Sequence, residues 1–229
     1  MGRHTLDGKP PIDVILRTSG RARRLSLRLS RLDGRATLTI PATASQAEAI
    51  GFLRTKEAWL RRHIADIAPP QAAEAGGRVL FAGQERPVVI DPGTRARLMA
   101  DGFHVPDGRT AGARIKGILR ARAREALTEA SDDYAAMLGL TYRRITLRDT
   151  RSRWGSCTAD GALMYSWRLI MAPPEVLAYV AAHEVAHLAE MNHSPAFWAV
   201  VTRLYGDYAP PRRWLRENGD KLHRISFGD

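Results

Sequence analysis

The sequence predicts an α+β fold, with a small β-rich N-terminal module followed by a domain built around a helix that carries a His-Glu-x-x-His motif. Short segments of alternating apolar and polar residues dominate the first part of the chain. Long stretches with helical periodicity dominate the second half, and one of them, an unusually apolar stretch, contains the motif. We place the boundary near residue 110, which gives a β-rich module over 1–110 and the motif-bearing domain over 111–229.

The N-terminal module is expected to contain short strands and one helix. The predicted strands cover residues 14–17, 25–29, 36–40, 78–81, 86–90 and 95–99. Asp33 and Gly34 form a good hairpin turn within the first group. Residues 45–67 carry an apolar stripe at helical spacing, and Ser45 followed by Glu48 is typical of a capping box at the start of a helix.

The second domain is expected to combine long helices with a small sheet. The helical pattern over residues 111–138 stops at Gly139. Strands are expected at 144–147 and 162–170. Further helices are expected to start at Pro173-Pro174, at Ser194-Pro195 and at Pro210-Pro211, because proline suits the first turn of a helix.

Composition excludes several classes of protein. The single cysteine, Cys157, rules out an internal disulfide and a four-cysteine zinc site. No apolar run approaches the roughly 20 residues that span a bilayer, and the N-terminus lacks the apolar segment of a secretory signal. We therefore expect a cytoplasmic protein with no membrane partner.

The chain is strongly basic, with a net charge of +11 and a pI of about 10.6. Arginines cluster within residues 17–35, 114–124 and 212–224. Such clusters can attract nucleic acid or another polyanion, whereas arginines that merely solvate helix faces are the alternative. The chain has no paired zinc-finger cysteines and no aromatic RNA-binding motif. Because of the basic charge alone, nucleic acid stays a candidate partner beside a protein or peptide substrate.

The most informative segment is His183-Glu184-Val185-Ala186-His187. Residues four apart share one face of a helix, so both imidazoles can bind the same ion. Glu184 lies next to the first of these ligands and can act as a general base on a water bound to that ion. A catalytic zinc needs this combination of ligands, an open coordination position and a base. The alternative is a pair of satisfied histidines on a buried helix face.

His193 is the expected third ligand. It follows His187 by six residues, which an unbroken helix would place off the ligand face. A helix that ends near Met191, with Asn192 in a left-handed conformation, would bring His193 back to the metal. The apolar helix also implies buried imidazoles, which require partners. The sequence thus predicts that His183, His187 and His193 bind a metal, with Zn²⁺ preferred.

Two stretches resemble the YgjP-type predicted metal-dependent hydrolases, relatives of the SprT and WLM zinc-metallopeptidase families. They are RSRWGSC (151–157) and MYSWRLIMAPPEVLAYVAAHEVAHLAEMNHSPAFW (164–198). The resemblance is specific over about residues 148–214. It implies a zincin-like metallopeptidase fold, with the three histidines as zinc ligands and Glu184 as catalytic acid and base. Ser166 stands where family members usually have Asn, which leaves the role of that side chain open.

Residues preceding the motif have weaker claims. The candidate substrate-binding residues are Trp154, Gly155 and Ser156. They occupy the position of the strand that lines the substrate cleft in zincins, although a tight turn under a buried Trp is equally consistent with the sequence. Cys157 is expected to be a small buried hydrophobe rather than a ligand. Arg153 and Arg168 could orient substrate, but structural or solvated ion pairs are the commoner fate of arginine.

Two functions follow from these observations. In the first, the chain is a zinc metallopeptidase that hydrolyses peptide bonds with a zinc-bound water activated by Glu184. In the second, it is a basic nucleic-acid-binding protein whose metal site is structural or vestigial. A protease acting on nucleic-acid-bound proteins would combine both. Glu184 favours the enzyme, because a structural zinc site closes with four ligands and needs no base.

Overall fold

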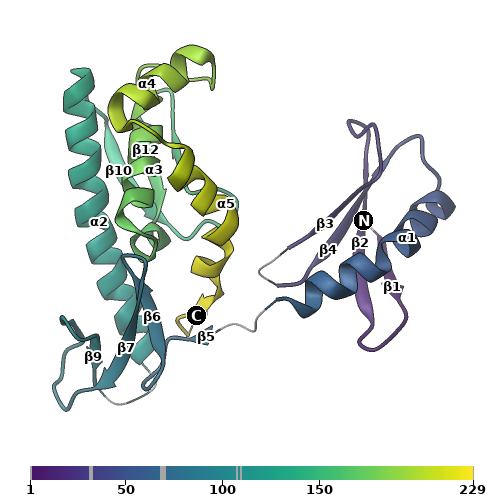
Figure 1. Ribbon diagram of the computed structural model, residues 1–229, viewed down its shortest axis with the longest axis horizontal. Helices are drawn as coiled ribbons and strands as arrows, with labels where there is room; N and C mark the ends of the chain where they lie inside the picture. Colours follow the sequence, from purple (N-terminus) through teal and green to yellow (C-terminus); the bar gives the residue numbers. More distant parts are fainter. Residues whose placement is uncertain (1, 31–32, 68–70, 107, 109, 229) are drawn as a thin grey trace. The chain divides into compact units, whose positions relative to one another are not determined.

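The computed structural model describes residues 2–30, 33–67, 71–106, 108 and 110–228, and the chain forms two compact units, Met1–Pro69 and Pro70–Asp229 (Figure 1). Both units combine helices and sheets, so the predicted α+β class is confirmed. No helix within the described ranges has the length and apolar character needed to cross a membrane.

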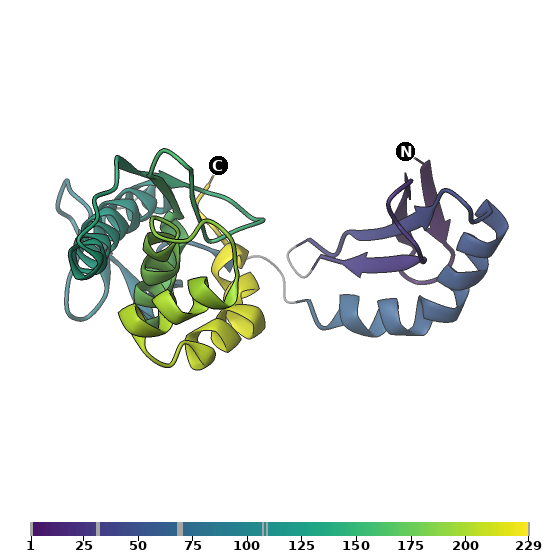
Figure 2. The ribbon, with the colours of Figure 1, turned by 90° about the horizontal axis from the view of Figure 1, so that it is seen from above.

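The N-terminal unit is a four-stranded sheet with helix α1 (Gln46–Ala65) along one face (Figure 2). Its strands, in the spatial order β1-β2-β4-β3, are β1 (Gly2–Leu6), β2 (Ile12–Ser19), β3 (Ser26–Leu29) and β4 (Ala36–Pro41). The capping box forms as predicted, with Ser45 Oγ accepting from the Glu48 N–H and the Glu48 carboxylate accepting from the Ser45 N–H. Leu53 and Leu60 of α1 join the buried apolar face of the sheet.

The C-terminal unit is organised around α2 (Ala111–Leu138), which ends at Gly139 in a left-handed conformation with φ +67°. One sheet has the order β6-β7-β9-β8 and another the order β10-β12-β11. Their strands are β6 (Arg78–Phe81), β7 (Gln84–Ile90), β8 (Arg97–Leu98), β9 (Phe103–Val105), β10 (Arg144–Arg148), β11 (Gly155–Cys157) and β12 (Ala162–Ser166). A short pair joins β5 (Gln71–Ala72) to β13 (Ile225–Ser226).

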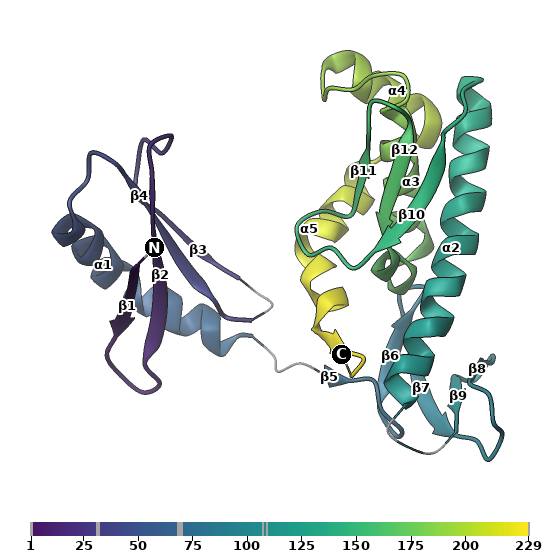
Figure 3. The same cartoon turned by 180° about the vertical axis from the view of Figure 1, so that it is seen from behind.

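The remaining helices follow β12 (Figure 3). They are the 3-10 segment η1 (Trp167–Met171), α3 (Pro174–Ala186), α4 (Pro195–Tyr205) and α5 (Ala209–Arg224). The strand predicted over 162–170 therefore ends at Ser166. The three helices predicted to start at prolines are present.

The division between the units falls at residues 69 and 70 rather than near residue 110, where the sequence placed it. The reason is that the strands before α2 bury their apolar side chains in the same core as α2. Val79, Val88 and Phe103 are almost fully buried in one cluster with Ile115 and Leu119 of α2. Local patterns in the sequence could reveal these strands but not the helix against which they pack.

An ion pair between the buried Arg168 and the more exposed Asp149 fixes the segment between β12 and α3. The guanidinium of Arg168 donates to both carboxylate oxygens of Asp149, at 2.7 and 3.1 Å, and to the carbonyls of Leu222 and Ile225. Arg168 is 7% exposed. Its role is thus structural, one of the two alternatives that the sequence left open. Loss of the Asp149 carboxylate would leave the buried guanidinium of Arg168 without its charged partner, which destabilises the fold.

Candidate metal centre

Helix α3 orients the His-Glu-x-x-His motif. It begins with Pro174. Proline suits this position because an N–H in the first turn has no hydrogen-bond partner within the helix. Helix α3 packs against α2, α4, α5 and β11, and its apolar residues are buried on almost every side. Because the helix is anchored all round, the faces that carry His183, Glu184 and His187 cannot rotate without breaking core contacts.

His193 reaches the motif by a route different from the predicted one. Helix α3 ends at Ala186, earlier than expected, and consecutive tight turns carry the chain onward to residue 190. Among the described non-glycine residues only Ala82 has a positive φ, so the predicted left-handed Asn192 is wrong. Instead, Oδ1 of Asn192 accepts from the Ser194 N–H at 3.0 Å, just before Ser194 caps α4.

The three predicted ligands nevertheless meet. Nitrogen atoms of His183, His187 and His193 all lie within 4.8 Å of one another. The Nε2 atoms of His183 and His193 are 3.0 Å apart. Nitrogens bound at 2.0–2.1 Å to a tetrahedral metal such as zinc stand about 3.3 Å apart, so this spacing fits a shared ion.

The Nδ1 atoms of His187 and His183 support the same arrangement. Nδ1 of His187 lies 3.0 Å from the carbonyl oxygen of Glu190. A carbonyl can only accept, so Nδ1 carries the proton and Nε2 presents its lone pair to the cluster. Nδ1 of His183 is buried and has no hydrogen-bond partner in the described part of the chain. Its Nε2 is therefore the nitrogen available to a ligand.

Burial keeps these imidazoles in the form that binds cations. It lowers the pKa of His183 to about 3, with repulsion from His187 and His193 acting in the same direction. Burial also lowers the pKa of His187. Phe197 covers the cluster, with its ring 4.4 Å from that of His187 and 4.9 Å from that of His183. A buried imidazole that resists protonation keeps a nitrogen lone pair with which it can bind a metal ion.

Glu184 lies beside the histidines and is 5% exposed. Burial raises the pKa of its carboxyl to about 8, although the positive charge of Arg153 opposes that shift. A carboxylate in this environment is a stronger base than an exposed one. The site therefore pairs a set of cation ligands with a group able to accept a proton near neutral pH.

Strand β11 supplies the opposite wall. A hollow of about 230 Å³, here called the metal-centre hollow, is lined by Gly155, Ser156, Cys157, His183, Glu184, His187, Met191 and His193. Gly155 leaves the space that Glu184 fills, because a Cβ there would lie 2.5 Å from Oε1 of Glu184. The strand pairs with β12 on one side only, as an edge strand of the described sheet. This geometry favours a cleft-lining strand over the alternative of a tight turn.

Trp154 lies outside the metal-centre hollow, whereas Cys157 lines it without the properties of a metal ligand. The indole of Trp154 stacks on the imidazole of His223 at 5.0 Å and lies over Gly219 of α5, so it packs β11 against that helix instead of lining the hollow. Cys157 is half-buried against the core, and burial raises the pKa of its thiol to about 11. Such a thiol stays protonated, which suits the expected packing role better than metal ligation.

Comparisons with known proteins identify the family. The family model described as YgjP-like, metallopeptidase domain matches residues 23–218. A solved structure, the metallopeptidase zymogen of Pyrococcus abyssi abylysin, shares 18% identity at a TM-score of 0.37, covering 43% of this chain and 97% of that one. No curated protein matches. Because the family match spans most of the sequence, the chain belongs to the YgjP-like metallopeptidase-domain family.

Proposed function

We propose that the protein is a zinc-dependent peptidase in which His183, His187 and His193 hold the metal and Glu184 is the general base. The observation that carries this proposal is the meeting of three imidazoles and one buried carboxylate in a single hollow. The family to which the chain belongs supports the same class of reaction.

The composition of the ligand set supports a catalytic metal site. Imidazoles suit zinc, and three protein ligands leave a coordination position open for water or substrate. Within the described ranges, the group of side chains placed to share an ion contains these three histidines and no fourth member. A structural site would use a fourth protein ligand and would not place an acid such as Glu184 beside the opening.

The mechanism follows from the positions of the protein groups. Zinc, when bound, supplies Lewis acidity that lowers the pKa of water and polarises a carbonyl group. Glu184 accepts the proton of the attacking water and returns it to the amine that leaves, so one peptide bond and one water become an acid and an amine. The free edge of β11 can hold the peptide extended beside Glu184 through backbone hydrogen bonds.

Metal removal tests this function. Wild-type protein should hydrolyse unfolded polypeptide, lose that activity after treatment with a chelator, and regain it when Zn²⁺ is added back. Activity is measured by the appearance of new amino termini, and residual metal by elemental analysis of the same samples. Hydrolysis that continues in protein shown to be free of metal would contradict the proposal.

A further inference from the structure

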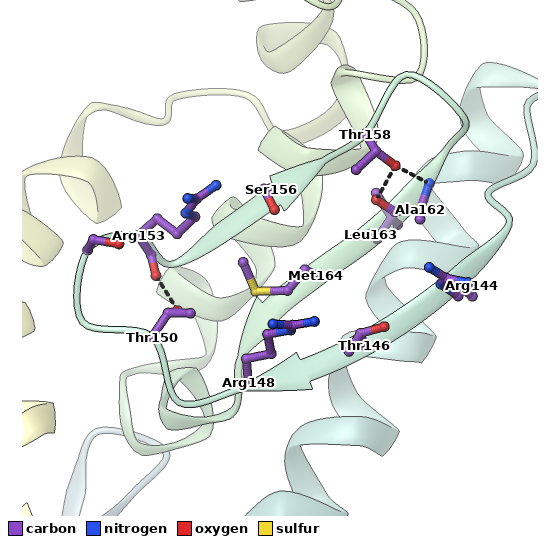
Figure 4. A pocket seen from close by; sticks show the side chains of 11 residues that line it. Arg144, Thr146, Arg148, Thr150, Arg153, Ser156, Thr158, Ala162, Leu163 and Met164 are labelled. Atoms are coloured by element: carbon purple, nitrogen blue, oxygen red, sulfur yellow. Dashed lines mark hydrogen bonds between the residues drawn. The ribbon is translucent and has the colours of Figure 1, made fainter.

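A second hollow lies on the open face of the β10-β12-β11 sheet (Figure 4). Its volume is about 320 Å³, and its lining residues are Arg144, Thr146, Arg148, Thr150, Ser152, Arg153, Ser156, Thr158, Ala162, Leu163 and Met164. Leu147 and Tyr165 point from the same strands into the core, and side chains alternate along a strand. Arg144, Thr146 and Arg148 therefore share the outer face. We call this feature the arginine hollow.

The arginine hollow carries positive charge without a partner. Arg144, Arg148 and Arg153 form no ion pair and no side-chain hydrogen bond with another described residue, whereas nearby Arg143 pairs with Asp160 and Arg168 pairs with Asp149. None of the described residues that line the hollow is acidic. Hydroxyl groups also line it, and those of Thr150 and Thr158 already donate within the protein. Guanidinium groups are suited to a carboxylate or a phosphate.

The arginine hollow and the metal-centre hollow share a lining residue on β11. Ser156 lines both. Gly155 faces Glu184, and Ser156, the next residue along the strand, lies opposite Met164 of β12 on the arginine side. A peptide paired with β11 would therefore place alternate side chains on the arginine face, next to Ser156.

We propose that the arginine hollow is a specificity subsite that receives an acidic side chain, Asp or Glu, of the extended peptide lying along β11. This inference rests on the proposed peptidase function. The volume lies at the small end of the range for ligand pockets, which fits one or two side chains. The lining has no aromatic side chain on which the bases of a single-stranded nucleic acid could stack. These features favour an acidic peptide over nucleic acid.

The test uses two peptides that differ only by Glu or Gln at a position on the arginine face, cleaved by zinc-loaded protein. Wild type should cleave the Glu peptide with a kcat/KM roughly 10- to 100-fold higher, the range expected for hydrogen bonds to a charged group. Arg148→Ala should bring that ratio close to one. Arg120→Ala removes an exposed arginine of α2 outside the hollow and should leave the ratio unchanged.

The outcomes separate the two proposals. If wild type cleaves neither peptide, the peptidase function fails and the subsite fails with it. If wild type cleaves both peptides equally, or if the preference for Glu survives in Arg148→Ala and in Arg153→Ala alike, the subsite alone is overturned. An oligothymidine whose salt-dependent binding is lost in Arg148→Ala, without any preference for Glu in cleavage, would also overturn it and reassign the hollow to phosphate. Reversal of the preference by Arg148→Glu, towards a peptide with Lys at the same position, would support it.

Discussion

Replacing Glu184 by Gln is expected to reduce peptide hydrolysis about 10²- to 10⁴-fold, the usual contribution of a general base. The amide has nearly the shape of the carboxylate and fits the same space between α3 and Gly155. It cannot accept the proton of the attacking water. The metal should stay, because Glu184 is not one of the three clustered ligands. Steady-state hydrolysis rates and elemental analysis of the same preparation measure both quantities.

A matched control for this variant is Glu175→Gln. Glu175 lies in the first turn of the same helix and is exposed, and its backbone carbonyl accepts from the hydroxyl of Tyr205. That variant should hydrolyse peptides at the wild-type rate. Full activity in Glu184→Gln would remove Glu184 from the mechanism, and loss of the metal would assign it to the ligand set instead.

Replacing Gly155 by Ala is expected to abolish most activity although position 155 carries no reactive group. The new methyl would lie 2.5 Å from Oε1, 2.6 Å from Cγ and 2.7 Å from Cδ of Glu184, well inside the 3.5–4.0 Å at which carbon atoms pack. The carboxylate must move, and a displacement of about 1 Å in a catalytic group can cost 10²-fold in rate. We expect a loss of about that size, with metal content retained.

Gly117→Ala is the control for this second variant. Gly117 lies within α2, and a Cβ there meets nothing within 4 Å. That substitution should leave hydrolysis unchanged and slightly raise the melting temperature, because Ala favours helix over Gly. Wild-type activity in Gly155→Ala would show that Glu184 does not depend on the space beside β11. Circular dichroism distinguishes a displaced carboxylate from a failure to fold.

Much of the fold was readable from local sequence patterns. The apolar stripe and the capping box at Ser45 and Glu48 gave α1, and the proline pairs marked the starts of the later helices. The meeting of His183 and His187 could also be predicted, since their four-residue interval places both on one helix face. These features depend on neighbours close in the chain.

The features that were not predicted depend on contacts between distant residues. The strands before α2 pack onto that helix. For this reason the two units divide at residues 69 and 70 instead of near residue 110. Asn192 bonds Ser194 through its side chain instead of adopting a left-handed conformation. The strand over 144–147 was predicted, but the arginine hollow was not. It depends on the register of β12 with β10 and β11, which sets Arg148 opposite Ser166 and Ser156 opposite Met164.

The central claim is that three histidines bind one metal ion, and metal content tests it most directly. Wild type, His193→Ala and His4→Ala should be purified side by side and analysed for zinc. His4 lies in β1 of the N-terminal unit, outside the cluster, and controls for the loss of a histidine. About one zinc per chain is expected in wild type and in His4→Ala, with most of it lost in His193→Ala. Equal zinc in all three proteins, or none in wild type supplied with Zn²⁺, would contradict the account.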